Sequence, residues 1–264
     1  NDYIPTAWYL KEIQHLNGEK LIFTYTAHTY SYDNGVSQTM YDPGLSGLGS
    51  GCICTAIATS TCVNITNTVG VLLSSIESPG KGLINFDYIV RDDCGDKLIN
   101  RITYKDPVNT IGSFDLAYNT VTSSATYNNE YYQGRDKTPY LISITENSSD
   151  NTQHKKHYFS YFDPEGRPSR LSFSQDHWGY FNGKINTSFV PDMGIMYSHG
   201  FPNAKGNREP EFTYAKKGLL QKVVYPTGGT TTLFYEPNIV DNGSTNDYTT
   251  LHKLSCDVTG TGVH

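Results

Sequence analysis

The segment Asp176-His177-Trp178-Gly179-Tyr180 contains the residue types in this chain best suited to chemistry. A histidine beside a carboxylate is a pairing that acid–base catalysis uses. Successive residues of an extended chain point to opposite faces, however, so Asp176 and His177 are poorly placed to share a proton. We therefore favour a structural interpretation, in which Trp178 and Tyr180 are buried around a tight glycine turn and Asp176 accepts backbone hydrogen bonds. Ligand binding by Trp178 and Tyr180, which could stack on a sugar ring, is the alternative.

Three of the five cysteines, Cys52, Cys54 and Cys62, lie in one stretch rich in Gly, Ser and Thr. A disulfide there would tether a loop that has little else to hold it, which suits an oxidising compartment. Free thiols are the alternative. A zinc site is disfavoured because C-x-C-x7-C lacks a second closely spaced pair of ligands. We expect a local disulfide among these three cysteines, no metal and no cofactor.

No other motif predicts catalysis. The chain has no G-x-S-x-G nucleophile elbow, and its glycine-rich run GLSGLGSG lacks the Lys-Ser/Thr of a phosphate-binding loop. His154 and His157 flank two lysines, which would repel a cation, so we predict a solvated loop edge there. Asp92 and Asp93 are typical of a turn. We expect no enzymatic activity from this segment, although a pair of carboxylates that meets only in space stays possible.

A pattern of aliphatic and aromatic residues recurs along the chain. Leu10 and Ile13 are followed by a turn and then by Phe23 and Tyr25. The same offsets give Leu73, Ile76, Phe86 and Tyr88 in a second copy and Leu220, Val223, Leu233 and Tyr235 in a third. Looser copies lead from Ile99 and Ile102 to Tyr118, and from Leu141 and Ile144 to Tyr161. Alternation in each copy, with Asn-Gly, Pro-Gly or Gly-Gly between its halves in the three close copies, predicts β-hairpins.

The repeat predicts an all-β fold of hairpins that stack edge to edge into one antiparallel sheet. We place hairpins near residues 8–27, 71–90, 98–118, 140–162 and 218–236, with loop insertions at 29–70 and 119–137, in a single unit spanning 1–264. The Phe/Leu-x-Tyr positions should form a ladder along this sheet. The structural residues predicted are Phe23, Tyr25, Phe86, Tyr88, Leu233 and Tyr235 in the ladder, Pro226, Gly228 and Gly229 in a turn, and Trp178.

Composition agrees with this fold class and excludes several others. Of 264 residues only 17% are charged, whereas 13% are aromatic, including 21 Tyr, and the formal net charge is −6. Tyr and Thr favour strands and Gly, Pro and Asn favour turns, which argues against a helical bundle. The many apolar residues argue against disorder. An acidic chain without a Lys/Arg cluster argues against nucleic-acid binding. No apolar run approaches the roughly 18 residues that span a membrane.

Three stretches carry a resemblance to a known family. They are WYLKEIQHLNGEKLIFTYT, DHWGYFNGK (Asp176 to Lys184) and NREPEFTYAKKGLLQKVVYPTGGTTTLFYE. The chain resembles a segment upstream of the Rhs core in very large Bacteroidota proteins of the Rhs/YD-repeat type, which carry D-x-W-G-Y-x-N-G-K and YPTGG hairpin motifs. The resemblance implies a spiral or shell-like β-sheet, incomplete at both ends of this chain. The D-P-x-G-L self-cleavage region of the Rhs core is not matched, since DPEGR at 163–167 lacks the Leu and DPGL at 42–45 lacks one residue.

The resemblance also implies a function, location and partners. Relatives are secreted or lie on the cell surface, and some enclose a toxic C-terminal domain, as polymorphic toxins do. In Bacteroidota, such proteins resemble cargo of the type 9 secretion system, which is associated with surface adhesins and gliding motility. We therefore expect a structural segment that encloses or displays another part of its own longer chain. Its partners would be the rest of that chain, translocon components or other surface proteins. A glycan- or cell-binding adhesin module is the alternative.

Overall fold

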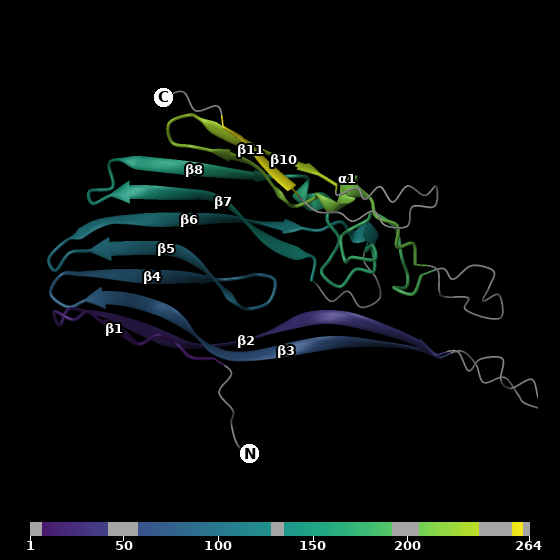
Figure 1. Ribbon diagram of the computed structural model, residues 1–264, viewed down its shortest axis with the longest axis horizontal. Coiled ribbons are helices and arrows are strands. Elements are labelled where there is room, and N and C mark those ends of the chain that lie inside the picture. The colour runs from purple at the N-terminus through teal and green to yellow at the C-terminus, as the bar shows by residue number, and fades with distance from the viewer. Residues whose placement is uncertain (1–6, 42–57, 128–134, 192–205, 238–254, 261–264) are drawn as a thin grey trace, which may run out of the picture.

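The computed structural model describes residues 7–41, 58–127, 135–191, 206–237 and 255–260. Within them, eleven strands form one antiparallel sheet in which neighbours in space are also neighbours in the chain. The strands are β1 (Glu12–Gln14), β2 (Lys20–Tyr41), β3 (Ala58–Ser78), β4 (Gly82–Val90), β5 (Lys97–Lys105), β6 (Thr110–Thr122), β7 (Lys137–Ser148), β8 (His154–Tyr161), β9 (Leu220–Val224), β10 (Thr230–Glu236) and β11 (Ser255–Gly260). Figure 1 shows them in chain order across the sheet, which is open, not closed into a barrel. The predicted all-β class is confirmed.

Each stretch that the repeat marks as a hairpin contains two consecutive antiparallel strands. These pairs are β1/β2, β3/β4, β5/β6, β7/β8 and β9/β10. Turn chemistry explains the tight connections: Gly18, Gly80 and Gly228 have positive φ, a conformation that glycine adopts without steric cost. Consecutive hairpins pair with each other through β2/β3, β4/β5, β6/β7 and β8/β9. The sheet is therefore a row of hairpins in chain order.

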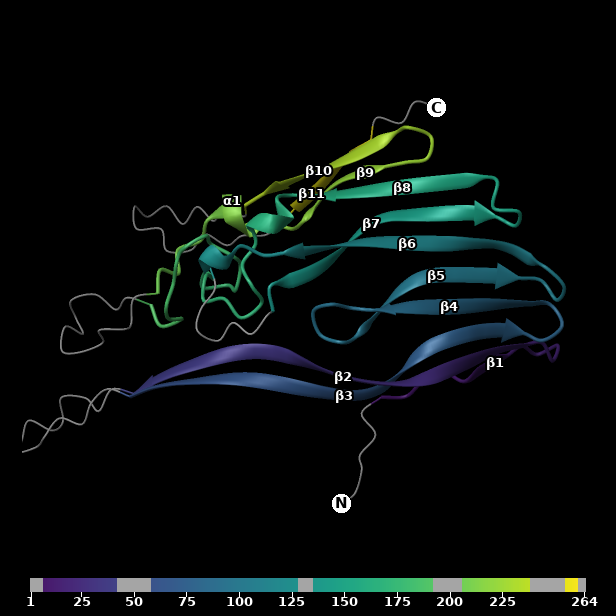
Figure 2. The same cartoon turned by 180° about the vertical axis from the view of Figure 1, so that it is seen from behind.

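The predicted loop insertion at 29–70 is wrong for its described parts, because residues 29–41 and 58–70 continue β2 and β3. The two strands pair from Ile22↔Glu77 to Tyr41↔Ala58 and extend past the shorter strands as a two-stranded arm (Figures 1 and 2). Alternating Thr and Tyr outweigh the Ser, Asn and Gly that suggested a loop. The insertion at 119–137 is also shorter than predicted, since β6 runs to Thr122 and a 3-10 turn, η2, occupies Ala125–Tyr127.

Most of the sheet is a single layer. Among the described residues, the buried apolar side chains are Val121, Tyr140, Leu171 and Phe173. They lie at the end of the sheet where the segments 163–191 and 206–219 pack as irregular loops, with a 3-10 turn η3 (Pro164–Gly166) and a one-turn helix α1 (Phe212–Ala215). Elsewhere the apolar face of the sheet is only half-buried. No helix in the described segments is long and apolar enough to cross a membrane.

Candidate functional site

One hydrogen bond is repeated in all five hairpins. A tyrosine hydroxyl on the second strand donates to the backbone carbonyl of an aliphatic residue that lies two positions before the first strand begins to pair with the second. The pairs are Tyr25–Leu10 at 2.8 Å, Tyr88–Leu73 at 2.7 Å, Tyr118–Ile99 at 2.8 Å, Tyr161–Leu141 at 2.8 Å and Tyr235–Leu220 at 2.7 Å. We call this contact the tyrosine link. Both of its residues are positions that the sequence repeat marks.

The tyrosine link lies where the backbone ladder of each hairpin stops. In β3/β4 the last ladder pair is Ser75↔Asn85; Ser75 lies two residues after Leu73 and Asn85 lies three residues before Tyr88. The other four hairpins end their ladders at the same offsets from their own linked residues. The link therefore supplies a donor for a carbonyl that has left the strand ladder.

The same tyrosine also marks the junction with the following hairpin. Tyr88 lies opposite Ile99 of β5, and a β-bulge falls between Asp87 and Tyr88. Equivalent bulges precede Tyr25, Tyr118 and Tyr161. Bulges increase local twist and bend a strand. In these four hairpins the tyrosine of the link therefore also lies at the bulge through which the hairpin pairs with the next one.

Burial raises the pKa of the hydroxyls of Tyr88, Tyr118 and Tyr161 above the ordinary tyrosine value. For Tyr161 the neighbouring Tyr140 and Tyr118 raise the pKa further. These hydroxyls therefore remain protonated donors at neutral pH. In each link the hydroxyl acts as a hydrogen-bond donor to a backbone carbonyl.

The DHWGYFNGK segment folds as a tight hairpin on a buried polar base. The carboxylate oxygen Oδ1 of Asp176, a fully buried residue, accepts from the backbone N–H groups of Trp178 at 2.8 Å and Tyr180 at 2.9 Å. Gly179 has φ +89°, which the turn requires. Asn182, also fully buried, donates through Nδ2 to the carbonyls of Asn207 at 2.8 Å and Glu209 at 3.1 Å.

Two more residues fix this hairpin in place. Arg208 donates through Nε to the carbonyl of Asp176 at 3.0 Å and through Nη1 to the carbonyl of Phe189 at 3.0 Å. Gly183 has φ +68° and lies so close to the ring of Tyr214 that a Cβ atom there would overlap it. Asp176, Gly179, Asn182 and Gly183 thus account for the turn.

The predicted burial of Trp178 and Tyr180 is wrong. Trp178 is 50% exposed and Tyr180 is 38% exposed, and His177 between Asp176 and Trp178 is exposed as well. The physical reason is that Asp176 accepts hydrogen bonds from the backbone of the turn, and Gly179 and Gly183 adopt its positive φ angles. The turn is therefore stabilised without burying the two aromatic side chains. The hairpin presents Trp178 and Tyr180 to solvent on a rigid base. Nearby, Tyr127 packs edge-on against Phe181 and Tyr214.

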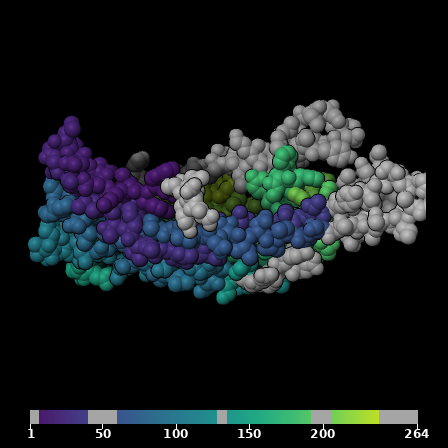
Figure 3. All heavy atoms as spheres, turned by 90° about the horizontal axis from the view of Figure 1, so that it is seen from below, coloured from purple at the N-terminus to yellow at the C-terminus, as the bar shows by residue number. Residues whose placement is uncertain are grey.

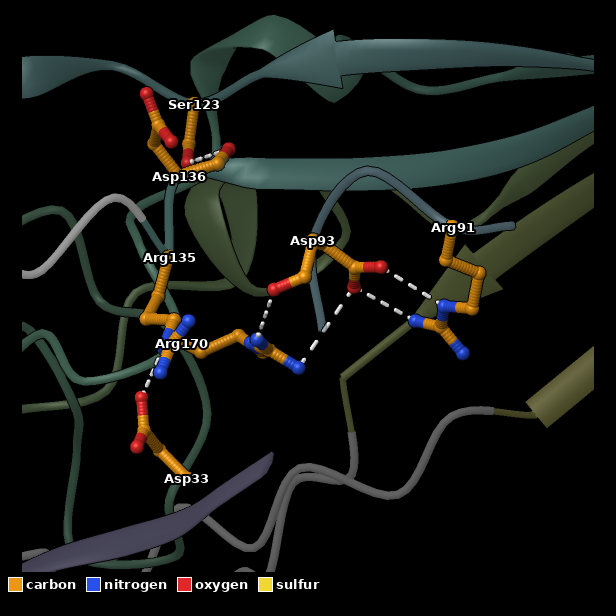
Figure 4. A network of polar contacts seen from close by, with 7 residues as sticks. All are labelled: Asp33, Arg91, Asp93, Ser123, Arg135, Asp136 and Arg170. Atoms are coloured by element: carbon orange, nitrogen blue, oxygen red, sulfur yellow. Dashed lines mark hydrogen bonds and ion pairs between the residues drawn. The ribbon is translucent and has the colours of Figure 1, made fainter. Parts of the chain in front are cut away.

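A buried ion pair holds the two-stranded arm against the loop end of the sheet (Figure 4). Asp33 of β2, whose side chain is 3% exposed, pairs with Arg135 just before β7. The register of β2 and β3 shifts between Asp33 and Gly35. Such a bulge interrupts the regular alternation of side chains between the two faces of the strand at Asp33. Further along the arm, Gln38 accepts hydrogen bonds from the Ser188 hydroxyl at 2.7 Å and the Phe189 N–H at 2.9 Å.

A second ion pair closes the β4–β5 loop. Arg91 donates to both carboxylate oxygens of Asp93 at 2.8 and 2.7 Å, and Arg170 approaches one of them at 3.7 Å. Burial alone would raise the pKa of Asp93, but the Arg91 hydrogen bonds and the two positive charges lower it below the ordinary value. In the same loop, Asp96 contacts His28 of β2 at 3.0 Å. The arm is therefore fixed at three places along its length.

Other predicted residues lie as follows. Pro226, Gly228 and Gly229 form the β9–β10 turn, in which the Tyr225 N–H donates to the Gly229 carbonyl at 2.8 Å. Cys62 is a free, exposed thiol on β3 opposite Ser37, so the disulfide expected for it is not formed; the strand pairing already holds this position. Cys52 and Cys54 lie outside the described residues.

The two histidines are also placed differently from the prediction. His154 and His157 are strand residues of β8, not a loop edge. His154 contacts the side chain of Asn147 at 2.7 Å, and His157 packs edge-on against Tyr225. In the described segments, no group of three His, Cys, Asp or Glu side chains is arranged to hold a metal ion.

Sequence reasoning missed the ion pairs and the acceptor of the tyrosine link. Asp33 and Arg135 are 102 residues apart, so no local pattern connects them. The link has a signal, because three of the five pairs have the same separation of 15 residues. Comparison of the chain with known families, curated proteins and solved structures found no match.

Proposed function

We propose that this chain is a scaffold: part of the β-shell of a large secreted or cell-surface protein of the Rhs/YD-repeat type. It encloses or displays another part of the polypeptide, is exported as type 9 secretion cargo, and has no catalytic residues of its own. The observation that carries the proposal is the tyrosine link, which recurs in five consecutive hairpins. A unit that closes and joins its neighbours in the same way each time can extend a sheet indefinitely.

The half-buried apolar face supports the same proposal. Phe86 and Phe159 lie on this face, and over most of the sheet no second layer of described residues covers it. Apolar surface of this extent marks a place where another surface binds. In a shell, that surface is the enclosed part of the polypeptide.

Hydroxyl-radical footprinting of the protein purified from its source, compared with the 264-residue chain alone, tests the shell. We expect Phe86 and Phe159 to be oxidised less in the source protein. Tyr158, which is 50% exposed on the opposite face of β8, is the control and should be oxidised equally in both. Equal oxidation of Phe86 and Phe159 would overturn the shell proposal. Digestion of this segment by protease added to intact cells tests its surface location.

A second candidate function is glycan or cell-surface binding by the Asp176–Tyr180 hairpin. The favouring observation is the exposure of Trp178 and Tyr180 on a base that holds them rigidly. Aromatic side chains in this setting offer a large contact area at a low entropic cost. Binding to a glycan array that is lost in Trp178→Ala and kept in Val108→Ala, an equally folded surface variant, would support it. An array profile unchanged by Trp178→Ala would exclude it.

A further inference from the structure

Strand β1 differs from the other strands that open a hairpin. Strands β3, β5, β7 and β9 each lie between their hairpin partner and the last strand of the preceding hairpin. Strand β1 pairs with β2 on one side and with no other described strand. Yet it belongs to the same repeat, because Leu10 and Ile13 occupy the positions of Leu73 and Ile76.

The aliphatic side chains at the repeat positions are more exposed at β1 than in the equivalent strands, which have a second neighbouring strand. Leu10 is 52% exposed and Ile13 is 46% exposed. Their counterparts are all half-buried: Leu73, Ile76, Ile99, Ile102, Leu141, Ile144, Leu220 and Val223. Trp8 and Leu16, beside β1, are 82% and 103% exposed. Figure 3 shows the purple residues of β1 and β2 at the surface of this edge.

The backbone of β1 is oriented for one more strand. The Phe23 N–H donates to the Lys11 carbonyl at 2.9 Å, and the His15 N–H donates to the Glu19 carbonyl at 2.8 Å. Since hydrogen bonding alternates along an antiparallel strand, the odd-numbered residues of β1 face β2. The N–H and C=O groups of Glu12 and Gln14 therefore point away from the sheet, as on any open edge.

The register that a further strand would take beside β1 can be read from four existing junctions. In each, a tyrosine lies opposite the first aliphatic residue of the following hairpin, and the Phe or Leu two residues earlier lies opposite the second. The pairs are Tyr25↔Leu73 with Phe23↔Ile76, Tyr88↔Ile99 with Phe86↔Ile102, Tyr118↔Leu141 with Leu116↔Ile144, and Tyr161↔Leu220 with Phe159↔Val223.

We propose that the free edge of β1 binds an antiparallel strand of the type Phe/Leu-x-Tyr, with its tyrosine opposite Leu10 and its Phe or Leu opposite Ile13. Backbone pairing would supply affinity and the two apolar contacts would supply register, as in β-strand addition generally. The inference deepens the proposed scaffold function by naming how the sheet is extended. Its test uses the purified chain, so it can fail while footprinting still supports the shell.

The probe is a labelled peptide with the sequence of β4 from Leu83 to Val90, flanked by lysines for solubility. We expect it to bind the 264-residue chain in a fluorescence anisotropy titration. Amide exchange followed by NMR should slow about tenfold at Glu12 and Gln14 on binding. The amide of Val108, in the β5–β6 turn, should not change. A peptide carrying Phe86→Asp or Tyr88→Asp should not bind, whereas Asp87→Asn should bind equally well.

The matched chain variants are Ile13→Asp, which should abolish binding, and Val108→Asp, at an 85% exposed position, which should keep it. The peptide variants keep the test independent of whether Ile13→Asp unpairs β1 from β2. Absence of binding, or binding without slower exchange at Glu12 and Gln14, would overturn the proposal. Slower exchange of these amides with rising protein concentration and no peptide would overturn the proposed occupant, because a second copy would then fill the edge.

Discussion

The hydroxyl of Tyr88 donates a 2.7 Å hydrogen bond to the backbone carbonyl of Leu73 on the neighbouring strand. The bond lies beyond the last ladder pair of its hairpin, Ser75↔Asn85, and so bridges two strands that have begun to part. Four other hairpins contain the same bond. A side chain thus links the two strands of every hairpin beyond the last backbone ladder pair, and each of the two linked residues lies at the same offset from that pair in all five hairpins.

Removing one hydroxyl should weaken the fold measurably. We predict that Tyr88→Phe lowers the free energy of unfolding by about 1 kcal/mol, because the Leu73 carbonyl loses its donor while the ring still packs. Urea denaturation followed by circular dichroism measures this. Tyr158→Phe is the control, since Tyr158 is half exposed and should change stability by less than about 0.5 kcal/mol. Equal effects of the two substitutions would show that the link contributes nothing.

Alkaline pH should destabilise the sheet through the same tyrosines. Burial raises the pKa of Tyr88, Tyr118 and Tyr161, so the folded chain keeps these protons when the unfolded chain has lost them. Their contribution is therefore complete below about pH 10 and is lost as the pH rises through the raised values. Urea unfolding at a series of alkaline pH values measures the loss. In a variant with all three tyrosines replaced by Phe the decline should be shallower; an equally steep decline would assign it to other groups.

The sheet could be predicted from sequence because its signals are local. Alternation from Phe23 to Tyr25 and glycine turns such as Gly228 are visible within a few residues. The acceptor of the tyrosine link was not predictable in the same way, because a backbone carbonyl leaves no mark on residue type. Only the equal spacing of Leu73 to Tyr88 and Leu220 to Tyr235 points to it.

Features that depend on distant contacts could not be predicted. The sequence predicts a loop for the arm because its Ser, Asn and Gly are weak strand formers, and because Asp33 and Gln38 contact their partners only in the folded chain. The burial of Trp178 was wrong because residue type does not tell which face of a turn meets solvent. The orientation of the hairpin is set instead by Arg208, which donates to the Asp176 carbonyl, and by Asn182, which donates to the Asn207 carbonyl.

The ion pair between Asp33 and Arg135 should show an asymmetry between its partners. Arg135→Ala leaves a carboxylate whose side chain is 3% exposed without its cation, and we predict a loss of about 3 kcal/mol. Asp33→Ala leaves an arginine side chain that is 28% exposed and can reach water, so about 1 kcal/mol should be lost. Chemical denaturation measures both, and faster proteolysis within residues 29–41 should accompany them.

A surface pair provides the control for this comparison. Lys155 and Glu146 are 3.8 Å apart with side chains 71% and 41% exposed, so Lys155→Ala should cost less than about 0.5 kcal/mol. If Arg135→Ala cost no more than Lys155→Ala, the buried pair would not be what holds the arm.

The Asp176–Tyr180 hairpin should depend on its carboxylate more than on its aromatic residues. We predict that Asp176→Ala costs about 2–3 kcal/mol, because two backbone N–H groups lose their acceptor. Asp176→Asn should cost less, since its amide oxygen can still accept both bonds and Oδ2 has no partner among the described residues. Trp178→Ala should cost less than about 1.5 kcal/mol, well below the 3–5 kcal/mol of a buried tryptophan, because half of its surface is already in water. Denaturation of the three variants gives the order directly, and a larger loss for Trp178→Ala than for Asp176→Ala would mean that the tryptophan, not the carboxylate, holds the turn.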